Sequence, residues 1–572
     1  MTDGAGRFPY GVASFEPSSS GVLLWTRTVG DGSLRWELAR DAGFTDLVAG
    51  EDLVAGEDLV VGADDTARRY DRPQRTAGER SHRIEVSDLP SGCDLYYRFE
   101  LDGVRSPTGR TRTLPSDDRP VRLGLACCAD YSTGFFSAYR ALADADVDLV
   151  VHLGDYLYAD AEGDLRDVDP DHDAVTRRDY GRRYAQLRRD PDLVALHQRH
   201  PMITVIDDHD LADNASRAGA KGHDTGEQGL WWDRMVAATA ARAEWLPIRT
   251  EGPPGRAGRA QWRSVALGEL GELILLDTRL AGRDPQADAD GPPLADPART
   301  LLGGPQMRWA ADRIADRVGP WAIVVSSVVV NDMALPVPFR FRLDTFPPGY
   351  HVEGGVALNT DGWDSYPAER ERLTAAFRTR GAGGVILSGD VHSSWAFEGP
   401  SDDEGPVAVE LTCPAVTSEP MGEMVPVVGR VLGPLLAADH GAAWADLFKR
   451  GYLVVEVAPT AVTARWWLSD PDRADATPIP VATFRTDLDR PGRLVAVDEA
   501  GSAESPDTHR GPLGRSERRR AKAPPVEGRP AGVHRHESRL RRSRRAGKVA
   551  RLGVATAAAF AGWRWTVRRS RT

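Results

Sequence analysis

The chain has few cysteines and no hydrophobic run long enough to cross a membrane. Its 572 residues include only four cysteines, Cys93, Cys127, Cys128 and Cys413. These are too few and too scattered for a disulfide framework, and the adjacent pair would point to opposite faces of a strand. The most membrane-like stretch, residues 552–563, is well short of the roughly 20 residues that span a bilayer. A disulfide-stapled scaffold and an integral membrane protein are therefore both disfavoured.

The N-terminus also lacks the pattern of a secretory signal. Met1 to Arg7 contains no basic region followed by an apolar core, which such a signal requires. From the sequence we therefore expect a protein that is cytoplasmic or peripheral to a membrane.

Charge is divided unevenly along the chain. Residues 501–572 hold 19 Lys and Arg against 5 Asp and Glu, a net charge of +14 within a total of −12, so the remainder carries −26. Such an acidic body does not suit nucleic acid, whose phosphates require a basic face, so nucleic acid is not expected as a specific partner. The body suits a protein that gathers carboxylates to hold cations.

The basic tail has two interpretations. Its arginine clusters lack apolar periodicity, which is typical of a solvated disordered segment. Alternatively, Arg551–Arg569 sets apolar residues and two tryptophans among arginines, as interfacial helices do, which would give weak contact with a membrane surface.

Residues 1–117 are predicted to form an all-β domain. Short segments rich in β-forming residues are separated by Gly, Pro, Asp and Ser: Val22–Arg27, Leu34–Leu38, His82–Val86 and Leu95–Leu101. Their spacing predicts a β-sandwich of the immunoglobulin or fibronectin type.

Residues 118–486 show a different pattern, in which apolar runs alternate with helical stretches. The runs are Leu123–Ala126, Val147–Leu153, Ile203–Ile206, Leu273–Leu276, Ala322–Val330, Val385–Leu387 and Val407–Leu411. Continuous apolar strands joined by helices predict an α/β domain whose sheet is buried on both faces. Because this periodicity ends near residue 487, residues 487–572 are predicted to be a disordered tail.

Polar side chains follow several of the apolar runs. They lie in four segments: Cys127–Tyr131, His152–Tyr158, Asp207–Asn214 and Gly389–Ser394. Since ligands of open α/β sheets bind beyond the carboxyl ends of the strands, we expect these segments to meet. So many buried anions would be very costly without cations between them. Their mixed oxygen, imidazole and thiolate donors predict a transition metal beside a hard divalent ion, a combination suited to phosphate ester hydrolysis.

As a set, the motifs resemble the PhoD-type alkaline phosphatases and phosphodiesterases of the metallophosphoesterase superfamily. The resemblance rests on Phe8–Ser14, Val22–Arg27, Tyr96–Phe99, Gly109–Pro115, Ala126–Cys128, His152–Tyr158, Asp207–Asp210 with Asn214, Leu276–Arg279, Asp361–Tyr366 and Ser388–Trp395. It implies an α+β multidomain fold, in which a four-layer α/β/β/α metallophosphoesterase domain follows the sandwich.

The resemblance also implies a set of metal ligands. Cys128, Asp155 and Tyr158 would hold Fe3+, with Asp155 bridging to a neighbouring metal. Asp208 and Asn214 would serve a second site, typically Ca2+ in this family.

Further roles follow from the same resemblance. Asp390 and His392 would complete the metal ligands. His209 and Arg279 would contact the substrate phosphate and stabilise charge in the transition state. The nucleophile would be a metal-bound hydroxide.

The sequence departs from the family at three points. The twin-arginine export signal common in the family is missing, Ile206 stands where the family usually has Trp, and Asp213 replaces the first of two frequent Asn residues. The last difference bears directly on the second metal site.

Structural interpretations stand beside these functional ones. Cys128 could be a small buried hydrophobe, Tyr158 could pack on the sheet, and Arg279 could simply pair with a carboxylate. Asp207 and His152 are interpreted as structural.

Three functional hypotheses remain open on the sequence alone. The first is a phosphoesterase that acts on small-molecule phosphate monoesters or diesters. The second is a phosphodiesterase, similar to phospholipase D, that acts on lipids or polyol-phosphate polymers. The third is a non-catalytic binding protein that contains a structural metal site.

Overall fold

The computed structural model describes most of the chain ahead of the basic tail. The described residues are 4–53, 78–249 except 162 and 164, 261–286, 296–333, 335–336, 351–352, 355–356, 359–424 and 441–497. The predicted tail beyond residue 500, with its apolar segment 552–563, lies outside these residues.

A ten-stranded sheet combines strands from the beginning and the end of the chain. Its order is β27-β26-β25-β24-β9-β10-β11-β1-β2-β5. The strands are β1 (Val12–Phe15), β2 (Val22–Val29), β5 (Glu79–Val86), β9 (Val121–Ala126), β10 (Leu149–His152), β11 (Met202–Thr204), β24 (Arg450–Val457), β25 (Ala461–Ser469), β26 (Ile479–Asp487) and β27 (Val495–Ala496). The neighbours β9, β10 and β11 are parallel, so their carboxyl ends meet at one edge.

A seven-stranded sheet lies beside it, in the order β12-β13-β14-β18-β22-β19-β23. Its strands are β12 (Arg263–Ala266), β13 (Gly271–Leu275), β14 (Trp321–Val325), β18 (Gly384–Ser388), β19 (Ser394–Glu398), β22 (Val409–Thr412) and β23 (Ala442–Asp446). From β13 to β22 the strands run parallel and are buried along their length. Short pairings complete the strands: β15 (Leu335–Pro336), β16 (His351–Val352) and β17 (Gly355–Val356), and β20 (Ser401–Asp402) with β21 (Gly405–Pro406).

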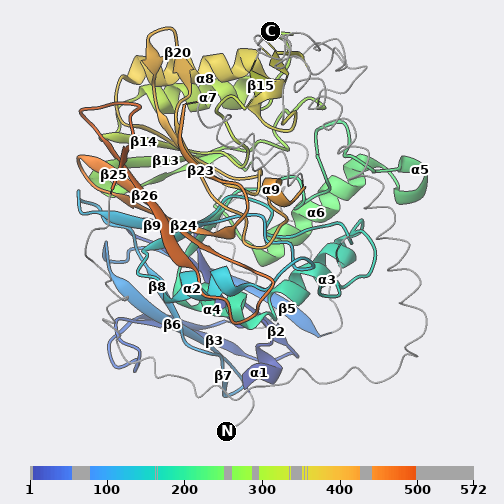
Figure 1. The fold of residues 1–572 in the computed structure, drawn as a ribbon. Helices are drawn as coiled ribbons and strands as arrows, with labels where there is room; N and C mark the ends of the chain where they lie inside the picture. Colours follow the sequence, from blue (N-terminus) through green and yellow to red (C-terminus); the bar gives the residue numbers. More distant parts are fainter. Residues whose placement is uncertain are drawn as a thin grey trace, which may run out of the picture.

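Helices cover the outer faces of the two sheets. Buried residues of α2 (Ser137–Asp144), α3 (Arg177–Leu187), α4 (Pro191–Arg199) and α6 (Trp231–Trp245) join a cluster with the ten-stranded sheet. Those of α7 (Gly304–Ala315) and α8 (Pro367–Arg380) join a cluster with the seven-stranded sheet. In Figure 1, α7 and α8 lie at the top and the N-terminal strands at the bottom, with the large sheets between them. The short helices are α1 (Gly4–Arg7), α5 (Thr225–Gln228) and α9 (Met421–Met424).

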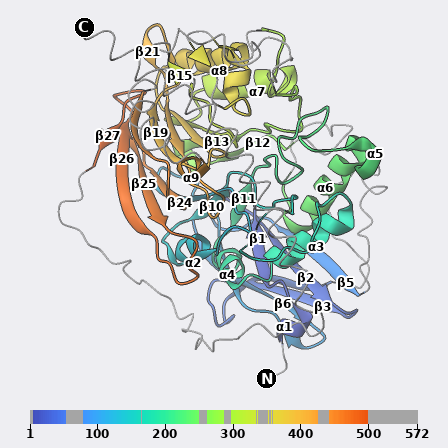
Figure 2. The same cartoon turned by 45° about the vertical axis from the view of Figure 1, so that its right-hand side comes forward.

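The space between the two sheets is filled by apolar side chains. Leu123 and Leu125 of β9 share a cluster with Leu273 and Leu275 of β13. Figure 2 shows β24 to β27 lying along one side of this interior. Alternate residues of each strand point inward here, because successive side chains of a strand face opposite ways.

Local sequence sets the starts of α3 and α4. Thr176 and Asp179 form a capping box at α3, each side chain accepting from the backbone N–H of the other. Asp190 caps α4, whose first residue is Pro191. Both patterns satisfy N–H groups that a helix start leaves without partners.

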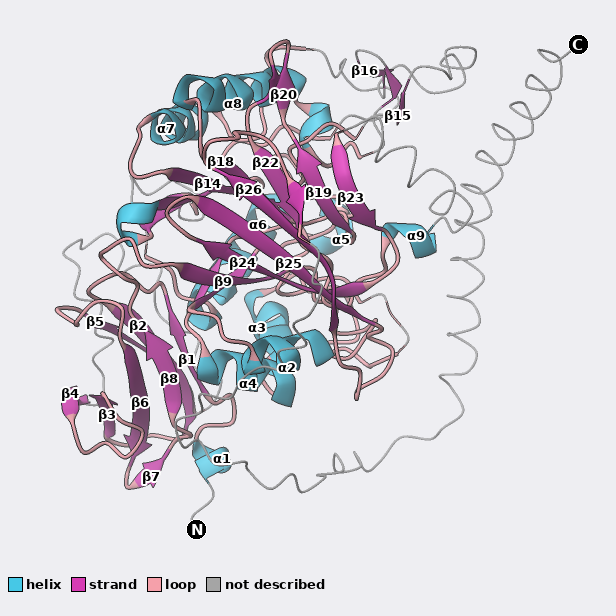
Figure 3. Cartoon of the chain, turned by 60° about the vertical axis from the view of Figure 1, so that its left-hand side comes forward, coloured by secondary structure: helices cyan, strands magenta, loops and turns pink. Residues whose placement is uncertain are grey.

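The N-terminal strands are shared between two sheets. The strands β3 (Leu34–Ala39), β4 (Leu47–Leu53), β6 (Asp94–Leu101), β7 (Val104–Arg105) and β8 (Gly109–Arg112) form a separate five-stranded sheet. It packs on β1, β2 and β5 through one apolar cluster, as Figure 3 shows at the lower left. One half of the expected sandwich is thus continuous with the ten-stranded sheet.

The mixed α/β architecture with several sheets is confirmed. The immunoglobulin type of the sandwich, the four-layer class and the domain boundaries stay predictions. The described strands continue past residue 486, since β27 pairs with β26 and Val497 donates a backbone hydrogen bond to Thr483.

No helix among the described residues is long and apolar enough to cross a membrane.

Candidate metal centre

The candidate site lies where strands of both large sheets end. Cys128, Asp155 and Asp208 follow the parallel strands β9, β10 and β11 of one sheet, and Asp390 follows β18 of the other. Arg279 follows β13, which lies beside β14 in the same sheet as β18. The side chains therefore meet at the carboxyl ends of the strands, as predicted, and they come from both large sheets.

Backbone conformation singles out the same residues. Cys128, Asp155, Asn214, Asp390 and His392 have φ values of 54°, 51°, 57°, 70° and 50°. They are five of the nine non-glycine residues with positive φ in the described part of the chain. This conformation is sterically unfavourable for L-residues and clusters at functional sites. We infer that this strained backbone conformation orients the side chains of these five residues.

Potential metal-ligand atoms form three overlapping groups. The first is Cys128, Asp155 and His392; the second is Asp155, Asp208 and His209; the third is Asp207, Asp208 and Asp390. Within each group the atoms lie within 4.8 Å of one another. Because Asp155 and Asp208 each belong to two groups, the groups form a continuous cradle.

Tyr158 lies against the first group. Its hydroxyl donates to Asp155 Oδ2 at 3.1 Å, and lies 3.3 Å from His392 Nε2 and 2.6 Å from Ser418 Oγ. Ser418 also donates to the carbonyl of Cys128 at 2.9 Å. The phenolic oxygen therefore faces the same point as the thiol, the carboxylate and the imidazole.

The second ring nitrogen fixes the orientation of His392. Its Nδ1 lies 2.9 Å from the carbonyl of Glu419, so we assign the ring proton to Nδ1. Nε2 then presents a lone pair to the centre, as metal-binding histidines do. Burial lowers the pKa of His392 to about 4, which favours the neutral ring.

Buried carboxylates oppose one another's ionisation. Burial raises the pKa of Asp155 well above its ordinary value, and Asp208 and Asp207 raise it further. Burial also raises the pKa of Asp390 strongly, with contributions from Asp361 and Asp207. Cations would remove this mutual repulsion.

The donor set fits metal ions. Asp207 Oδ2 is a buried oxygen with no hydrogen-bond partner among the described residues, and Asp207 belongs to the third group. The first group offers thiol, carboxylate and imidazole beside the phenol of Tyr158, whereas the third offers only carboxylates. The donors of the first group suit a transition metal, and the carboxylates of the third group suit a hard divalent ion.

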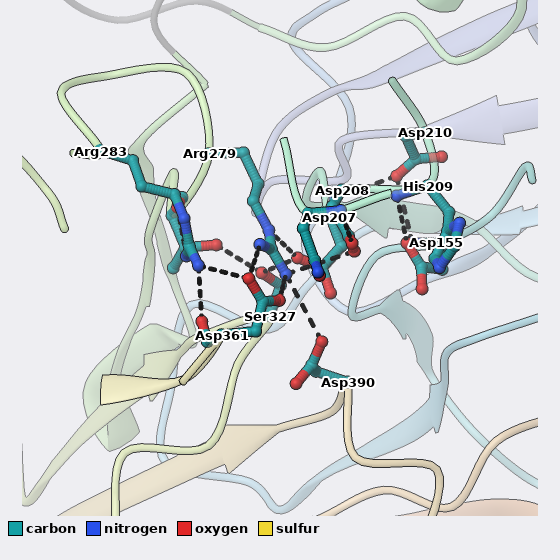
Figure 4. Close-up of polar contacts among 12 residues, drawn as sticks. Asp155, Asp207, Asp208, His209, Asp210, Arg279, Arg283, Ser327, Asp361 and Asp390 are labelled. Carbon is teal, nitrogen blue, oxygen red and sulfur yellow. Dashed lines mark hydrogen bonds and ion pairs between the residues drawn. The ribbon is translucent and has the colours of Figure 1, made fainter. Parts of the chain in front are cut away.

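Arg279 is enclosed by carboxylates. Its side chain is 0% exposed, and Nε donates to Asp207 Oδ1 at 2.5 Å. The two terminal nitrogens bind both oxygens of Asp361 at 2.8 and 2.6 Å, and one lies 3.2 Å from Asp208. A contact of 3.4 Å reaches Asp390 (Figure 4). The structure thus places Arg279 as a fixed cation inside the cradle, with every guanidinium nitrogen engaged; its predicted contact with substrate stays a prediction.

Asp361 anchors this guanidinium from the other side. Burial opposes its ionisation, but Arg279 and Arg283 outweigh burial and lower the pKa of Asp361. Arg283 donates to the side chain of Asp361 at 2.5 Å and to its carbonyl at 2.6 Å. Arg279 and Arg283 thereby link the segment after β13 to the segment around Asp361.

Asn214 reaches the second group through its backbone. Its N–H donates to Asp208 Oδ2 at 2.6 Å. The neighbouring Asp213 forms an ion pair with Lys221 at 2.7 Å, so it is not brought into the three groups. A side-chain ligand role for Asn214 stays a prediction.

His209 belongs to the second group, and its side chain is partly exposed. Its backbone N–H donates to Asp155 Oδ1 at 3.0 Å, its Nδ1 lies 2.7 Å from Asp160 Oδ2, and its ring stacks on Tyr158 at 4.2 Å. Burial lowers the pKa of this imidazole, but Asp208, Asp155 and Asp160 outweigh burial and raise the pKa well above its ordinary value. A charged imidazole here would suit a phosphate ligand.

Several residues of the site carried no role in the sequence interpretation. Asp160 stands two residues after Tyr158, and Ser418 follows a later strand; neither position has a distinctive motif. Asp361 opens a segment of the resemblance but had no assigned role. Asp207, interpreted as structural, belongs to the third group and also accepts from Ser327 at 2.9 Å. Cys127 instead packs in the core between the sheets, with Sγ 3.5 Å from the carbonyl of Pro414.

The fold and the site define a mixed α/β protein with a buried, multi-donor centre suited to metal ions. The family model described as "PhoD-like phosphatase" matches residues 123–466, and that described as "PhoD-like phosphatase, N-terminal domain" matches residues 2–115. The chain therefore belongs to the PhoD-like phosphatase family, which confirms the resemblance.

Two known proteins illustrate the relationship. The chain is 30% identical over 417 residues to "Alkaline phosphatase D" of Bacillus subtilis (strain 168), which covers 68% of this chain and 65% of that protein. The match therefore spans slightly less than two thirds of the length of that relative. A solved structure described as "Structure of PhoD" superposes with a TM-score of 0.72 at 25% identity, covering 87% of this chain and 94% of that chain.

Proposed function

We propose that this protein is a metal-dependent phosphoesterase that hydrolyses phosphate monoesters or diesters of small molecules. The single observation that carries the proposal is the cradle of three overlapping ligand groups at the strand ends. The family and the relative called alkaline phosphatase D support the reaction class. A four-layer α/β/β/α arrangement after the N-terminal strands is the fold that we propose for this catalytic unit.

We propose Fe3+ for the first group and Ca2+ for the carboxylate-rich groups. Cys128, Asp155, Tyr158 and His392 would hold the ferric ion, because phenolate, thiolate and imidazole favour a transition metal. Asp208, Asn214 and Asp390 would serve the calcium sites, which take oxygen ligands. Bound metals would activate a water as the nucleophile and neutralise phosphoryl charge.

The chain's own residues complete the chemistry. Asp155 belongs to two groups, so it would fix the positions of neighbouring cations relative to each other. Arg279 balances the charge of Asp207 and Asp208, two carboxylates of the third group. The imidazole of His209 lies beside both Asp155 and Asp208, where it can donate to a phosphoryl or leaving-group oxygen.

The first experiment combines elemental analysis with two chromogenic esters. We expect iron near one atom per chain, with calcium present, and calcium-dependent hydrolysis of p-nitrophenyl phosphate or bis-p-nitrophenyl phosphate. Asp155→Asn removes a ligand shared by two groups, so turnover should fall by at least about 100-fold. The matched control is Asp117→Asn, an exposed carboxylate paired with Arg119. Metal-free protein without turnover of either ester would contradict the proposal and favour a binding protein.

The better of the two esters decides between phosphatase and phosphodiesterase. A preference for the diester would favour the second hypothesis, an enzyme that acts on lipids or polyol-phosphate polymers. For that case we propose that the basic segment after residue 500 holds the protein at anionic surfaces. Co-sedimentation with phosphatidylserine vesicles should then be lost when the chain is ended after residue 500, and equal binding by both chains would contradict this role.

A further inference from the structure

Ser418 lies in a short segment that contacts several residues of the candidate metal centre. Its Oγ lies 2.9 Å from the carbonyl of Cys128 and 2.6 Å from the hydroxyl of Tyr158. The next residue, Glu419, presents its carbonyl to His392 Nδ1 at 2.9 Å. Two consecutive residues of one segment therefore touch Cys128, Tyr158 and His392.

The segment itself is held by its surroundings. Arg450 of β24 donates from Nε to the carbonyl of Ser418 at 2.9 Å, and its terminal nitrogens lie 3.3 and 2.9 Å from the carboxylate of Glu423. Thr417 donates from its hydroxyl to the carbonyl of Asp130 at 2.7 Å. Ser418 is buried, with 2% of its surface exposed. Its hydroxyl must therefore find its partners within the site.

The hydroxyl of Ser418 has one proton and two oxygens within reach. The carbonyl of Cys128 also accepts the backbone N–H groups of Thr417 and Ser418, at 3.3 and 3.2 Å, so it does not depend on this hydroxyl. The 2.6 Å between Ser418 Oγ and the oxygen of Tyr158 is a hydrogen-bond length and requires a proton between the two atoms. Either hydroxyl can supply that proton as long as Tyr158 is protonated.

Metal binding would remove one of these two sources. A tyrosine that ligates an ion does so as the phenolate, because metal ligands must be deprotonated, and the proton that it loses passes to solvent. The proton of Ser418 is then the one left for this contact. It reaches the phenolate by rotation about the Cβ–Oγ bond, and no covalent bond is broken. Without that rotation the phenolate would face a lone pair of Ser418.

We propose that Ser418 is a positioning residue, which donates a hydrogen bond to the phenolate oxygen of Tyr158 when this oxygen binds the ferric ion. The inference rests on the proposed function, because it concerns the iron site assigned there. Hydrogen bonds to ligand atoms tune the electronic properties of a metal centre. Since this bond draws electron density from the phenolate, it leaves the ion a stronger Lewis acid.

The test measures the visible absorption and the reduction potential of the iron-loaded protein. Phenolate bound to ferric iron gives a charge-transfer band, and a hydrogen bond that stabilises the phenolate raises the energy of this band. In Ser418→Ala we expect the band to move to longer wavelength, with the iron content unchanged. A hydrogen bond to a charged acceptor is worth about 10-fold or more in an equilibrium constant. The ferric form should be favoured by about that factor, which lowers the reduction potential by about 59 mV.

Two variants serve as controls. Ser418→Thr keeps the hydroxyl, so the band and the potential should return close to those of the unsubstituted protein. Thr417→Val removes a buried hydroxyl from the same segment, but the partner of that hydroxyl is the carbonyl of Asp130. Neither the band nor the potential should move in this variant. Melting temperature establishes that each variant is folded.

A further measurement needs no substitution. Resonance Raman excitation of the same band reports the C–O stretch of the phenolate. We expect this frequency to shift in heavy water, because the hydroxyl proton of Ser418 exchanges with solvent. The shift should persist in Thr417→Val and disappear in Ser418→Ala.

The outcomes separate this inference from the proposed function. An unmoved band and potential in Ser418→Ala, equal changes in Thr417→Val, or no shift of the unsubstituted protein in heavy water would each overturn the inference. If the phenolate band is present and esters are hydrolysed, the proposed function stands in all three cases. An iron-loaded, active protein without the band would overturn Tyr158 as a ligand and this inference with it. A protein that binds no metal and hydrolyses no ester would overturn both the inference and the proposed function.

Discussion

At the scale of single residues, the environment of Arg279 separates two roles that the sequence left open. A guanidinium that is 0% exposed and bound to Asp207 and Asp361 is already saturated by its own chain. Its planar, five-donor group cannot be replaced by the single point charge of lysine. We therefore regard Arg279 as the cation that assembles the third ligand group.

Arg279→Lys should weaken the affinity for calcium by about 10- to 100-fold, as loss of a residue that orients metal ligands typically does. Calorimetric titration of the calcium-free protein measures this affinity, and Arg313→Lys, which alters an ion pair with Glu272, is the matched control. Unchanged calcium affinity with a raised KM would instead favour the substrate contact predicted from the sequence.

The sequence predicts that polar residues that follow apolar strands meet at one site. The structure brings Cys128, Asp155, Asp208, Asp390 and His392 into the three groups, and their role as metal ligands stays a prediction. Residues whose role depends on a distant partner were not found, because no local pattern marks such a contact. The interaction between Asp160 and His209 spans 49 positions and is created only by the fold.

At the scale of elements, β1 is one of the connections between the N-terminal strands and the rest of the molecule. It pairs in parallel with β11, and just beyond its end Glu16 forms a buried ion pair with Arg263 at 2.5 Å, with side chains 3% and 2% exposed. Removing one partner of such a pair leaves an uncompensated buried charge.

Glu16→Gln should therefore lower the free energy of unfolding by about 3–5 kcal/mol. Denaturant unfolding followed by tryptophan fluorescence measures the change. The double variant Glu16→Gln with Arg263→Met should recover part of it, since no unpaired charge remains. Equal stability of the single variant and the unsubstituted chain would show that the pair is not a tie between these elements.

Strand β22 supplies a buried carboxylate whose ionisation depends on folding. Glu410 accepts from the backbone N–H groups of Val330 and Asn331 at 2.9 and 2.6 Å, and burial raises its pKa from 4.5 to about 7. Because the folded state holds this proton more tightly, its contribution is complete below pH 4.5 and is lost as the pH rises to about 7. The loss amounts to about 3 kcal/mol.

Glu410→Gln cannot titrate, so the free energy of unfolding should fall less steeply between pH 5 and pH 7 than in the unsubstituted chain. Metal-saturated protein is used for both, so that the metal ligands do not contribute to the difference. Parallel stability profiles for the two chains would contradict the raised pKa of Glu410.

The apolar runs predicted the buried parallel strands well, because a strand that is covered on both faces needs an almost continuous apolar sequence. The division of the N-terminal strands between two sheets was not predicted. It depends on the pairing of β1 with β11, and these two strands lie far apart in the chain. The local sequence of β1 is equally suited to a closed sandwich.

At the scale of the whole molecule, the acidic body should repel a dianionic phosphate ester of the kind proposed as a substrate. Residues 1–500 carry a net charge of −26, and salt screens such repulsion over about 10 Å at 0.1 M. We expect kcat/KM for p-nitrophenyl phosphate to rise when the ionic strength increases from about 10 to about 150 mM, a range over which the Debye length falls from roughly 30 to 8 Å.

p-Nitrophenyl phosphorylcholine has the same leaving group but no net charge, and its kcat/KM should change much less. Stopped-assay rates at matched pH and calcium measure both. A fall with salt for the dianionic ester would mean that local positive charge at the site dominates over the charge of the body.

The strand order of the ten-stranded sheet also determines when this sheet can finish folding during synthesis of the chain. Its strand β9 lies between β10 and β24, so one neighbour leaves the ribosome soon after β9, and the other only when almost the whole body has been made. β1 likewise cannot form its parallel pairing until β11 has been synthesised. Such long-range pairing delays folding and leaves strand edges open to other chains. The nascent chain is therefore most in need of a chaperone that shields unpaired strands during the long interval between β11 and β24.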